Sequence, residues 1–460
     1  MRNPDLLTAL RDALGPDRVF DDAATCALYA SDETPRRVTP DAVLFPASHS
    51  DVVALVRIAH AFGVPLTPRG AGSGNVGGAL PVPGGMVVSF ECMQRILEFD
   101  ADNRLIVVEA GVVTDEIDQQ ARNAGLFYPP DPGSSAYSRI GGNLAMNAAG
   151  PRAVKYGVTR DWVLGLRAVT GDGTEIRTGC RTTKGVTGLD LTRLLVGSEG
   201  TLALITEATL KLLPAPETVA TLRVCFASNR DALDAVQRVM CQSVVPSALE
   251  FMDARAIDAL RPGGGASDLA PGTHALLMVE ADGSATDVPR QIDTLQSALQ
   301  GQGLLEIRSG FSKAETRQLW AARKSLSHAV KRIAPLKINE DVVVPVSRLG
   351  ELVDFIDTLA DEARLPIVSF GHAGNGNLHV NLMVHPDNPD EMQRAHAALD
   401  ALMDRVIESG GTLSGEHGIG TEKRRFMARE IDPATLALMR AIKRQFDPDN
   451  LLNPGKLFPE

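Results

Sequence analysis

The sequence is poor in features that would mark several classes of protein. Its five cysteines lie far apart with no C-x-x-C pair, which excludes a cluster held by locally spaced thiolates and favours reduced thiols in a cytoplasmic protein. Acidic residues (57) outnumber basic ones (46), and the net charge of −11 argues against a nucleic-acid-binding protein. No segment approaches the ~20 uninterrupted apolar residues of a membrane span, and the N-terminus has no signal-peptide core. We therefore expect a soluble cytoplasmic protein.

The chain is long enough for more than one core, and its composition changes along its length. At 460 residues, two or more domains are expected. Residues 1–36 show helical spacing, and 37–216 are rich in glycine and short β-type runs. Residues 217–424 alternate strand-like and helical segments, and 425–460 combine a helix with a turn-rich tail. These patterns predict an α+β protein with this four-part division.

The segment "PRGAGSGNVGG" (68–78) contains a G-x-G-x-x-G pattern that invites comparison with a dinucleotide-binding βαβ unit. That unit needs a helix directly after the glycines, but "ALPVPGG" (79–85) places two prolines and two glycines there. We therefore reject the βαβ interpretation. The glycines instead allow successive backbone N–H groups to form a concave anion site, and a mobile surface loop is the alternative.

Two further glycine-rich segments favour the anion site. "PPDPGSSAYSRIGGNLAMNAAG" (129–150) and "GSEGTLALITEATL" (197–210) both lie in the β-rich part of the chain. Two such loops without a helical crossover could hold a diphosphate from two sides.

The segment "IVSFGHAGNGNLHVNLMV" (367–384) predicts a metal-binding hairpin. Asn375-Gly376 favours a two-residue turn between two β-type runs. Counting outward from this turn, His372 faces His379 across the hairpin, and Asn381 follows on the same face. Such a pair can chelate a divalent ion, whereas the alternatives are a structural histidine pair or one stacked on a bound cofactor.

A carboxylate to complete the metal site is available in "GGTLSGEHGIG" (410–420). Glu416 and His417 are adjacent, and neighbouring residues of an extended strand point to opposite sides. One ligand and one catalytic base is therefore the natural division between them.

These segments, together with "KYGVT", "GHAGNGNLH" and "NPGK", follow one another in the order seen in the FAD-linked D-2-hydroxyacid dehydrogenases, which the whole chain resembles. That group includes D-lactate and D-2-hydroxyglutarate dehydrogenases and the flavin subunit of glycolate oxidase, within the vanillyl-alcohol-oxidase type of FAD flavoproteins. The resemblance implies a PCMH-type FAD-binding domain, a ferredoxin-like α+β cap domain and a helical C-terminal segment returning to the flavin. It implies FAD contacts by Arg69, Gly70, Ala71, Gly72, Ser73, Gly74, Asn75, Pro130, Asp131, Ser134, Gly141, Gly142, Asn143, Asn147, Glu199, Gly200, Thr201, Ile205 and Asn453. The first loop has neither His nor Cys, so we expect non-covalent FAD.

The resemblance also assigns roles at the reaction site. His372, His379 and Glu416 would bind a divalent metal, with zinc as first choice and manganese, cobalt or iron as alternatives. His417 would be the catalytic base, and Arg323, Lys337 and Asn381 would bind the substrate. The expected reaction is oxidation of a small D-2-hydroxy acid, with hydride passing to flavin N5.

Several questions stay open at this point. The sequence encodes no second redox centre, so electrons would pass to a cytochrome, a quinone, an electron-transferring flavoprotein or an iron–sulfur subunit. The alternatives are a metal-free flavin alcohol oxidase of the same fold, a flavin subunit of a multi-subunit glycolate oxidase, and a non-catalytic flavin subunit that serves assembly or electron transfer in a larger complex. The choice among D-2-hydroxyglutarate, D-lactate and glycolate is undecided, and a homodimer is compatible with the sequence.

Overall fold

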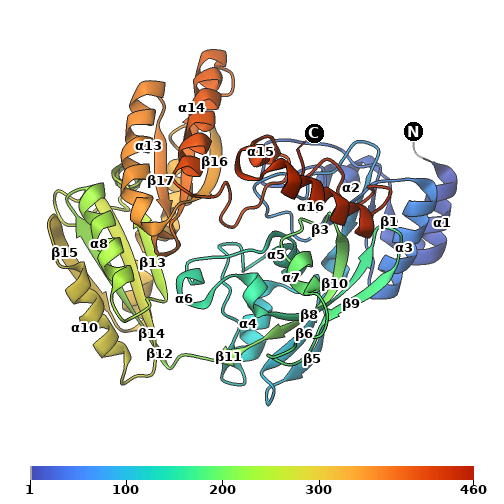
Figure 1. The fold of residues 1–460 in the computed structure, drawn as a ribbon, viewed down its shortest axis with the longest axis horizontal. Coiled ribbons are helices and arrows are strands. Elements are labelled where there is room, and N and C mark those ends of the chain that lie inside the picture. Colours follow the sequence, from blue (N-terminus) through green and yellow to red (C-terminus); the bar gives the residue numbers. More distant parts are fainter. Residues whose placement is uncertain (1–2, 460) are drawn as a thin grey trace. The chain divides into compact units, whose positions relative to one another are not determined.

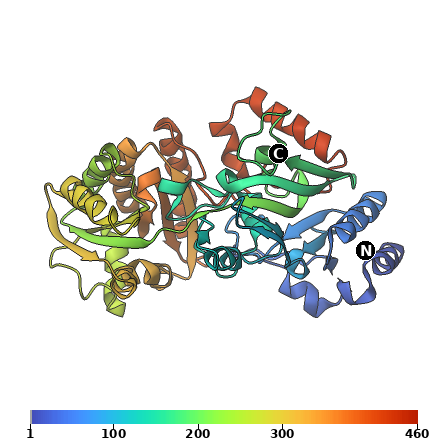
Figure 2. The same ribbon diagram turned by 90° about the horizontal axis from the view of Figure 1, so that it is seen from below.

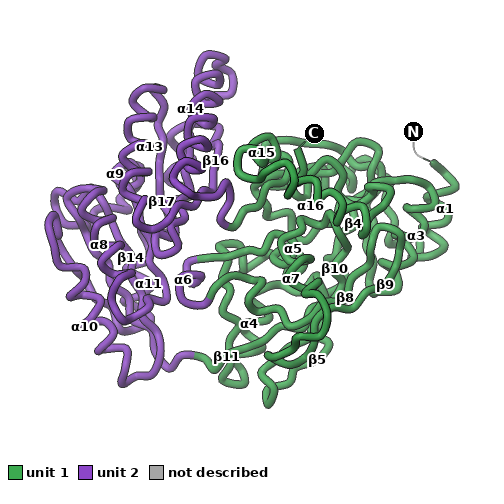
Figure 3. The backbone as a smooth tube through the Cα atoms, in the orientation of Figure 1, with its two compact units in different colours: residues 1–150, 157–215, 416–460 green, residues 151–156, 216–415 purple. Residues whose placement is uncertain are grey.

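The computed structural model describes residues 3–459, except for the side chains of residues 327 and 328. Met1 and Arg2 of the expected helical segment 1–36 therefore lie outside the described residues. The chain forms two compact units: unit 1 comprises residues 1–150, 157–215 and 416–460, and unit 2 comprises residues 151–156 and 216–415 (Figure 3). The four-part division expected from the sequence remains a prediction.

Unit 1 begins with a small sheet packed against helices. Its strands are β1 (Val19–Phe20), β2 (Ala42–Leu44), β3 (Leu66–Arg69) and β4 (Met86–Ser89), in the order β1-β2-β4-β3. Helices α1 (Pro4–Leu14), α2 (Ala23–Leu28) and α3 (His49–Phe62) accompany it (Figure 1). Helix α3 is bounded by Ser48, which accepts the N–H of Asp51, and by Gly63 in the left-handed conformation. The leucines of α1 and the valines of α3 join the sheet in one apolar core.

Strands β3 and β4 are parallel neighbours, with Leu66 opposite Met86 and Arg69 opposite Ser89. Residues 70–85, all of which the structure describes, connect them without a helix. The rejection of a βαβ dinucleotide site is therefore confirmed, because the prolines at 81 and 83 leave an irregular crossover between parallel strands.

The second sheet of unit 1 is antiparallel and has the order β5-β6-β10-β8-β9. Its strands are β5 (Ile96–Asp100), β6 (Leu105–Glu109), β8 (Val163–Thr170), β9 (Glu175–Gly179) and β10 (Ala203–Lys211). A turn at Gly171-Asp172-Gly173 joins β8 and β9, which pair antiparallel. Also in unit 1 are α4 (Thr114–Arg122), β7 (Leu126–Phe127), α5 (Ile140–Met146), α7 (Leu191–Leu195), β11 (Leu213–Pro214), α15 (Met427–Glu430) and α16 (Pro433–Phe446).

The segment after α16 returns to β3. The N–H of Leu66 donates to the carbonyl of Leu451 (2.8 Å), and the N–H of Asn453 donates to the carbonyl of Leu66 (2.9 Å). Residues 451–453 therefore cover the free edge of the four-stranded sheet, beside the first glycine loop.

Unit 2 is built on one large sheet with the order β15-β12-β14-β13-β17-β18-β16. Every pairing within it is antiparallel. The strands are β12 (Thr218–Phe226), β13 (Ala248–Met252), β14 (Ala275–Gly283), β15 (Leu304–Gly310), β16 (Leu336–Val343), β17 (Ile367–Gly371) and β18 (Asn377–Val384). The inner strands β13, β14, β17 and β18 are buried almost throughout, which explains their nearly continuous apolar sequences.

Helices lie along both faces of this sheet (Figures 1 and 2). One set comprises α8 (Asn229–Cys241), α10 (Val288–Leu299), α13 (Leu349–Ala363) and α14 (Pro389–Glu408). The other comprises α9 (Ala254–Leu260), α11 (Lys313–Leu319) and α12 (Ala321–Val330), which pack on Met252, Met278, Phe370 and Met383. The short helix α6 (Ala153–Tyr156) joins unit 2 because Lys155 and Tyr156 both bind the carboxylate of Asp282. The expected α+β architecture is confirmed, and no described helix has the length and apolar character of a membrane span.

Candidate functional site

The first two glycine loops of unit 1 lie against each other. A Cβ placed on Gly70 would be 3.7 Å from the backbone nitrogen of Gly142 and 3.1 Å from the Cβ of Arg139. A Cβ on Gly74 or on Gly142 would meet no heavy atom within 4 Å. The two loops therefore touch at Gly70, whereas Gly74 and Gly142 border open space that a ligand could fill.

Arg69 supports the first loop from beneath. Its Nη1 donates to the carbonyl of Ser31 (2.7 Å), and its guanidinium lies 5.5 Å from the centre of the Tyr29 ring. Gly72 has φ +73°, and a Cβ there would come within 2.1 Å of Arg69 Nη2. The loop conformation thus depends on glycine at 72 and on the guanidinium packed under it.

The third glycine segment connects to residues after 416 through Glu199. The two carboxylate oxygens of Glu199 accept the N–H groups of Ile419 and Gly420, each at 2.7 Å. Burial raises the pKa of Glu199, and these two hydrogen bonds oppose that rise. Glu199 therefore fixes the "GIG" turn that follows His417.

Asn453 joins the first and third segments. Its Nδ2 donates to the carbonyls of Gly78 (3.1 Å) and Glu199 (2.7 Å). Its Oδ1 accepts from the buried ammonium of Lys456, which also donates to the carbonyls of Gly78 and Leu80. The "NPGK" segment is thus hydrogen-bonded to both the first and the third glycine segments.

The remaining residues expected at the cofactor occupy the same part of unit 1. Asn147 ends α5 in the left-handed conformation and accepts the N–H of Arg160, and Asn143 donates to Thr114 Oγ1. Gly197 and Glu199 donate their N–H groups to Leu144 and Ala145 of α5, so the second and third segments are hydrogen-bonded together. The others lie in these loops or in β10: Ala71, Ser73, Asn75, Pro130, Asp131, Ser134, Gly141, Gly200, Thr201 and Ile205.

This arrangement fits FAD. The cofactor needs a backbone-lined cradle for its pyrophosphate, and two adjacent glycine loops facing open space supply one. The first loop contains neither histidine nor cysteine, and non-covalent attachment of FAD remains the prediction. Which of these residues touch the cofactor remains a prediction.

In unit 2, the predicted hairpin has a different register from the one expected. Phe370, not His372, lies opposite His379, and β17 ends at Gly371. Residues Ala373–Asn375 form a 3₁₀ turn that Gly376 ends at φ +75°, and a Cβ on Gly376 would lie 1.9 Å from the carbonyl oxygen of Val344. Close packing therefore selects a longer turn than the two-residue turn predicted from Asn375-Gly376.

The two imidazoles nevertheless meet. The ring centres of His372 and His379 are 5.2 Å apart, with an interplanar angle of 86°. Both side chains are buried. The pairing expected from sequence is thus reached through the loop that carries His372, not through a cross-strand pair.

A buried carboxylate holds His372. Glu250 of β13 is fully buried, and its Oε1 lies 2.5 Å from His372 Nδ1. Its Oε2 accepts a hydrogen bond from Nε of Arg323 on α12 (3.0 Å) and lies 2.9 Å from Nη2 of the same guanidinium, an ion pair. Burial by itself would raise the pKa of Glu250, but its interactions with His372 and Arg323 outweigh burial and lower the pKa to about 2.

A second buried carboxylate faces His379. Asp341 of β16 lies directly opposite His379 of β18, with Oδ1 3.8 Å from Nδ1. Asp341 also accepts from Nδ2 of Asn377 (2.6 Å), from Oγ of Ser414 (3.1 Å) and from the N–H of Gly415 (2.9 Å). Both histidines therefore have a buried acid near Nδ1.

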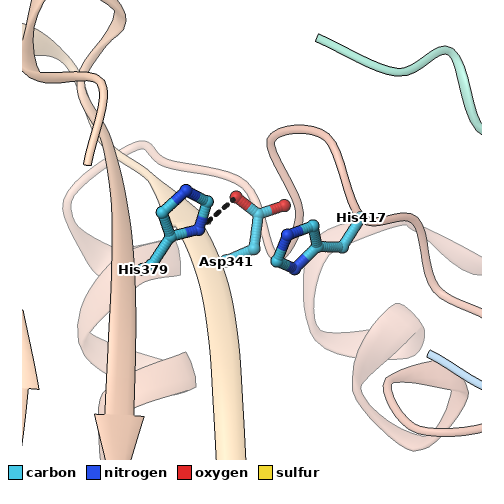
Figure 4. Close-up of side chains that lie close together, drawn as sticks. All are labelled: Asp341, His379 and His417. Atoms are coloured by element: carbon cyan, nitrogen blue, oxygen red, sulfur yellow. Dashed lines mark ion pairs between the residues drawn. The ribbon is translucent and has the colours of Figure 1, made fainter. Parts of the chain in front are cut away.

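Glu416 and His417 follow directly from this anchored segment. Thr412 pairs with Val343, and Gly415 is bound to Asp341, so the backbone leading to Glu416 is fixed on β16. Potential ligand atoms of His372, His379 and Glu416 lie within 4.8 Å of one another, as do those of Asp341, His379 and His417. Figure 4 shows Asp341 between the imidazoles of His379 and His417. Two imidazoles and a carboxylate are a donor set that suits zinc, and also manganese, cobalt or iron.

The expected substrate ligands gather on one face of the unit 2 sheet. Lys337, Asn339 and Asp341 are two residues apart along β16 and so share one face, and Asn339 lies opposite Asn381 of β18. Nδ2 of the fully buried Asn381 donates to the carbonyls of Val368 and His379, and among the described residues its Oδ1 has no hydrogen-bond partner. Arg323 reaches this face from α12, where its guanidinium lies 4.9 Å from the centre of the Phe370 ring.

Sequence reasoning missed Glu250 and Asp341. Each is an acidic residue inside an apolar β-type run, "ALEFM" or "INEDVVV", and such a position requires a partner when the strand is buried. That pattern would have marked both residues as candidates.

Comparison with known proteins supports this reading of the two units. Residues 40–179 match the family described as "FAD binding domain", and residues 215–457 match "FAD linked oxidases, C-terminal domain". The solved structure of p-cresol methylhydroxylase with substrate bound superposes with a TM-score of 0.80 at 18% identity, covering 98% of this chain and 96% of that one. At that identity the likeness concerns the fold.

Curated relatives are closer in sequence. The chain is 37% identical to the glycolate oxidase subunit GlcD of Bacillus subtilis (strain 168), over 100% of this chain and 97% of the relative. It is 34% identical to a D-lactate dehydrogenase of Anaerostipes hadrus, over 92% and 90% of the two chains. It is 33% identical to a D-2-hydroxyglutarate dehydrogenase of Stutzerimonas stutzeri (strain A1501), over the full length of both.

Proposed function

Because this chain belongs to the FAD-linked oxidases, in the group of the D-2-hydroxyacid dehydrogenases and glycolate oxidase, we propose that it oxidises a D-2-hydroxy acid to the 2-oxo acid and requires a divalent metal ion. The observation that carries the metal requirement is the buried pair His372 and His379, with Glu416 within ligand distance of both. An alcohol oxidase without a metal has no evident need for two imidazoles and a carboxylate at one point.

In the proposed reaction, each residue of the site has a separate role. His417 takes the proton of the substrate hydroxyl, because an imidazole nitrogen with a lone pair is a suitable general base. Arg323 binds the substrate carboxylate through the N–H groups that Glu250 leaves available, and Lys337 and Asn381 contribute from the same sheet face. When bound, FAD supplies a two-electron acceptor for hydride, and the metal supplies a positive charge that favours the ionised hydroxyl.

The substrate is a small acid such as glycolate, D-lactate or D-2-hydroxyglutarate, which are the substrates that the names of the relatives carry. The electron acceptor is external: a cytochrome, a quinone, an electron-transferring flavoprotein or an iron–sulfur subunit. The name of the Bacillus subtilis relative, which calls it a subunit, favours an acceptor held in a complex.

The test is the flavin absorbance of the FAD-loaded protein under argon. D-lactate, D-2-hydroxyglutarate, glycolate and the L-enantiomers are added separately, before and after dialysis against EDTA with metal content measured. We expect bleaching by a D-acid or glycolate, its loss when the metal is removed, and its return with zinc, manganese or cobalt. Bleaching that persists in metal-free protein would replace the proposal with a metal-free flavin oxidoreductase. No bleaching by any of these acids would contradict it.

A further inference from the structure

Glu250 contacts both a proposed metal ligand, His372, and the proposed substrate anchor, Arg323. Its two oxygens are divided between them, because Oε1 meets Nδ1 of His372 and Oε2 meets Nε and Nη2 of Arg323. A fully buried carboxylate needs such partners, since an unpaired charge in an apolar core costs several kcal/mol. The surroundings are apolar: Arg323 packs on Phe370, and Met252 and Met278 lie close by in the core.

The contact with Glu250 determines which nitrogen of His372 carries the proton and which way the ring faces. With the guanidinium of Arg323 beside it, Glu250 is an acceptor, so the Nδ1 that faces it carries the proton of the neutral imidazole. The lone pair is then on Nε2, the nitrogen directed away from Glu250. A carboxylate behind a metal-binding histidine fixes both the tautomer and the ring orientation.

We propose that Glu250 is a positioning residue that orients His372 toward the metal and Arg323 toward the substrate, thereby coupling the two binding functions. The inference rests on the metal site of the proposed function. It assigns to β13 a role that the resemblance did not suggest, since Glu250 lies outside all the motifs that carried it.

A matched control lies on the neighbouring strand. Glu280 of β14 is also a buried acid, and it accepts from Nε1 of Trp320 (2.6 Å) and Oγ1 of Thr221 (2.7 Å). Neither partner is a proposed ligand of metal or substrate. Glu280→Gln therefore removes a buried charge from the same sheet without disturbing His372.

The experiment measures zinc affinity of the full-length, FAD-loaded protein by competition with a chromophoric chelator, with no substrate present. We expect Glu250→Gln to weaken zinc binding about 10- to 100-fold, because the amide no longer enforces the Nδ1–H tautomer. Glu280→Gln is expected to stay within about twofold of the native protein, and Glu250→Asp to recover part of the loss. In steady state, Glu250→Gln should also raise KM for the acid at saturating zinc, because Arg323 loses its partner.

Zinc affinity of Glu250→Gln within twofold of native, with an unchanged melting temperature, would overturn the inference while leaving the proposed function intact. Flavin that no 2-hydroxy acid reduces, in protein that binds zinc, would overturn the function and not the inference. If Glu250→Gln does not fold, ¹⁵N-histidine NMR of the native protein decides: an Nδ1–H tautomer at His372 is expected, and an Nε2–H tautomer contradicts the assignment.

Discussion

Arg323 donates from Nε to one carboxylate oxygen of Glu250 (3.0 Å), and its Nη2 lies 2.9 Å from the same oxygen in an ion pair. Sequence reasoning selected Arg323 as the group that binds the substrate carboxylate. The structure shows that the guanidinium is first held by the protein, in a fixed plane over Phe370. A guanidinium fixed in this way can present its remaining N–H groups without losing rotamer freedom when substrate binds.

Arg323→Lys tests this arrangement. A lysine keeps the charge but cannot bind Glu250 and a substrate carboxylate with one planar group. We expect KM for the best 2-hydroxy acid to rise at least about tenfold, equivalent to roughly 1.4 kcal/mol of binding energy, with a smaller change in kcat. Arg317→Lys, on the exposed side of α11, is the control and should leave both constants unchanged. An unchanged KM in Arg323→Lys would remove Arg323 from the substrate site.

His417→Gln tests the proposed base. The variant retains a polar side chain after the anchored Gly415 but cannot accept the hydroxyl proton. We expect the rate of anaerobic flavin reduction to fall about 100- to 10,000-fold, with FAD content and zinc affinity close to native. His385→Gln, which alters an exposed histidine bound to Glu391, should reduce flavin at the native rate. A loss of less than tenfold would point to another base.

Gly72→Ala tests the first cofactor loop, and the chain offers a close comparison. Gly72 and Gly84 have φ of +73° and +75°, but a Cβ at 72 would come within 2.1 Å of Arg69 whereas one at 84 meets nothing within 4 Å. Both variants incur the left-handed strain of roughly 1–2 kcal/mol. We expect Gly72→Ala alone to weaken FAD binding, at least about tenfold, as measured by flavin fluorescence on dilution.

Equal FAD affinity in the two variants would show that Arg69 does not set the loop conformation. The same preparations test the attachment of FAD. Acid precipitation should release all of the flavin into the supernatant, since no covalent bond is expected. Flavin that stays with the protein pellet would contradict that expectation.

Asp253 predicts a pH dependence of stability in unit 2. Burial and the nearby Asp357 raise the pKa of Asp253 to about 7, despite hydrogen bonds from the N–H groups of Ala256 and Ser369. Between about pH 4 and 7 the folded protein therefore holds a proton that the unfolded chain has lost. The free energy of unfolding should fall as pH rises through this interval, by up to about 4 kcal/mol.

Asp253→Asn removes this titration. The variant is expected to be less stable than the native protein near pH 4, because an amide NH2 in place of Oδ2 cannot accept the N–H of Ser369. The difference in free energy of unfolding between the two proteins should become smaller toward pH 7. Calorimetric melting at several pH values measures it. A gap that is constant across the interval would show that Asp253 keeps an ordinary pKa.

The extent to which the sequence revealed the site depended on the range of the interactions involved. The absence of a helix after Gly77 followed from two prolines a few residues away, a local effect that tertiary packing does not reverse. The hairpin register was wrong because Gly376 packs against Val344, a contact that no rule of turn composition contains. Glu250 escaped notice because its partner His372 is 122 residues distant. The candidate metal and substrate ligands could be named from sequence. Glu250 and Asp341, the acids beside the two histidines, could be recognised only once the sheet brought these residues together.

The return of residues 451–453 to β3 has a consequence for synthesis of the chain. Because the ribosome makes the protein from the N-terminus, all of unit 2 emerges before Leu451 and Asn453 reach the edge of β3 and the carbonyls of Gly78 and Glu199. Through that interval the nascent unit 1 has an open sheet edge and unclosed glycine loops. The edge of β3 and the contacts that Asn453 makes with the glycine loops can therefore form only after the rest of the chain has been made.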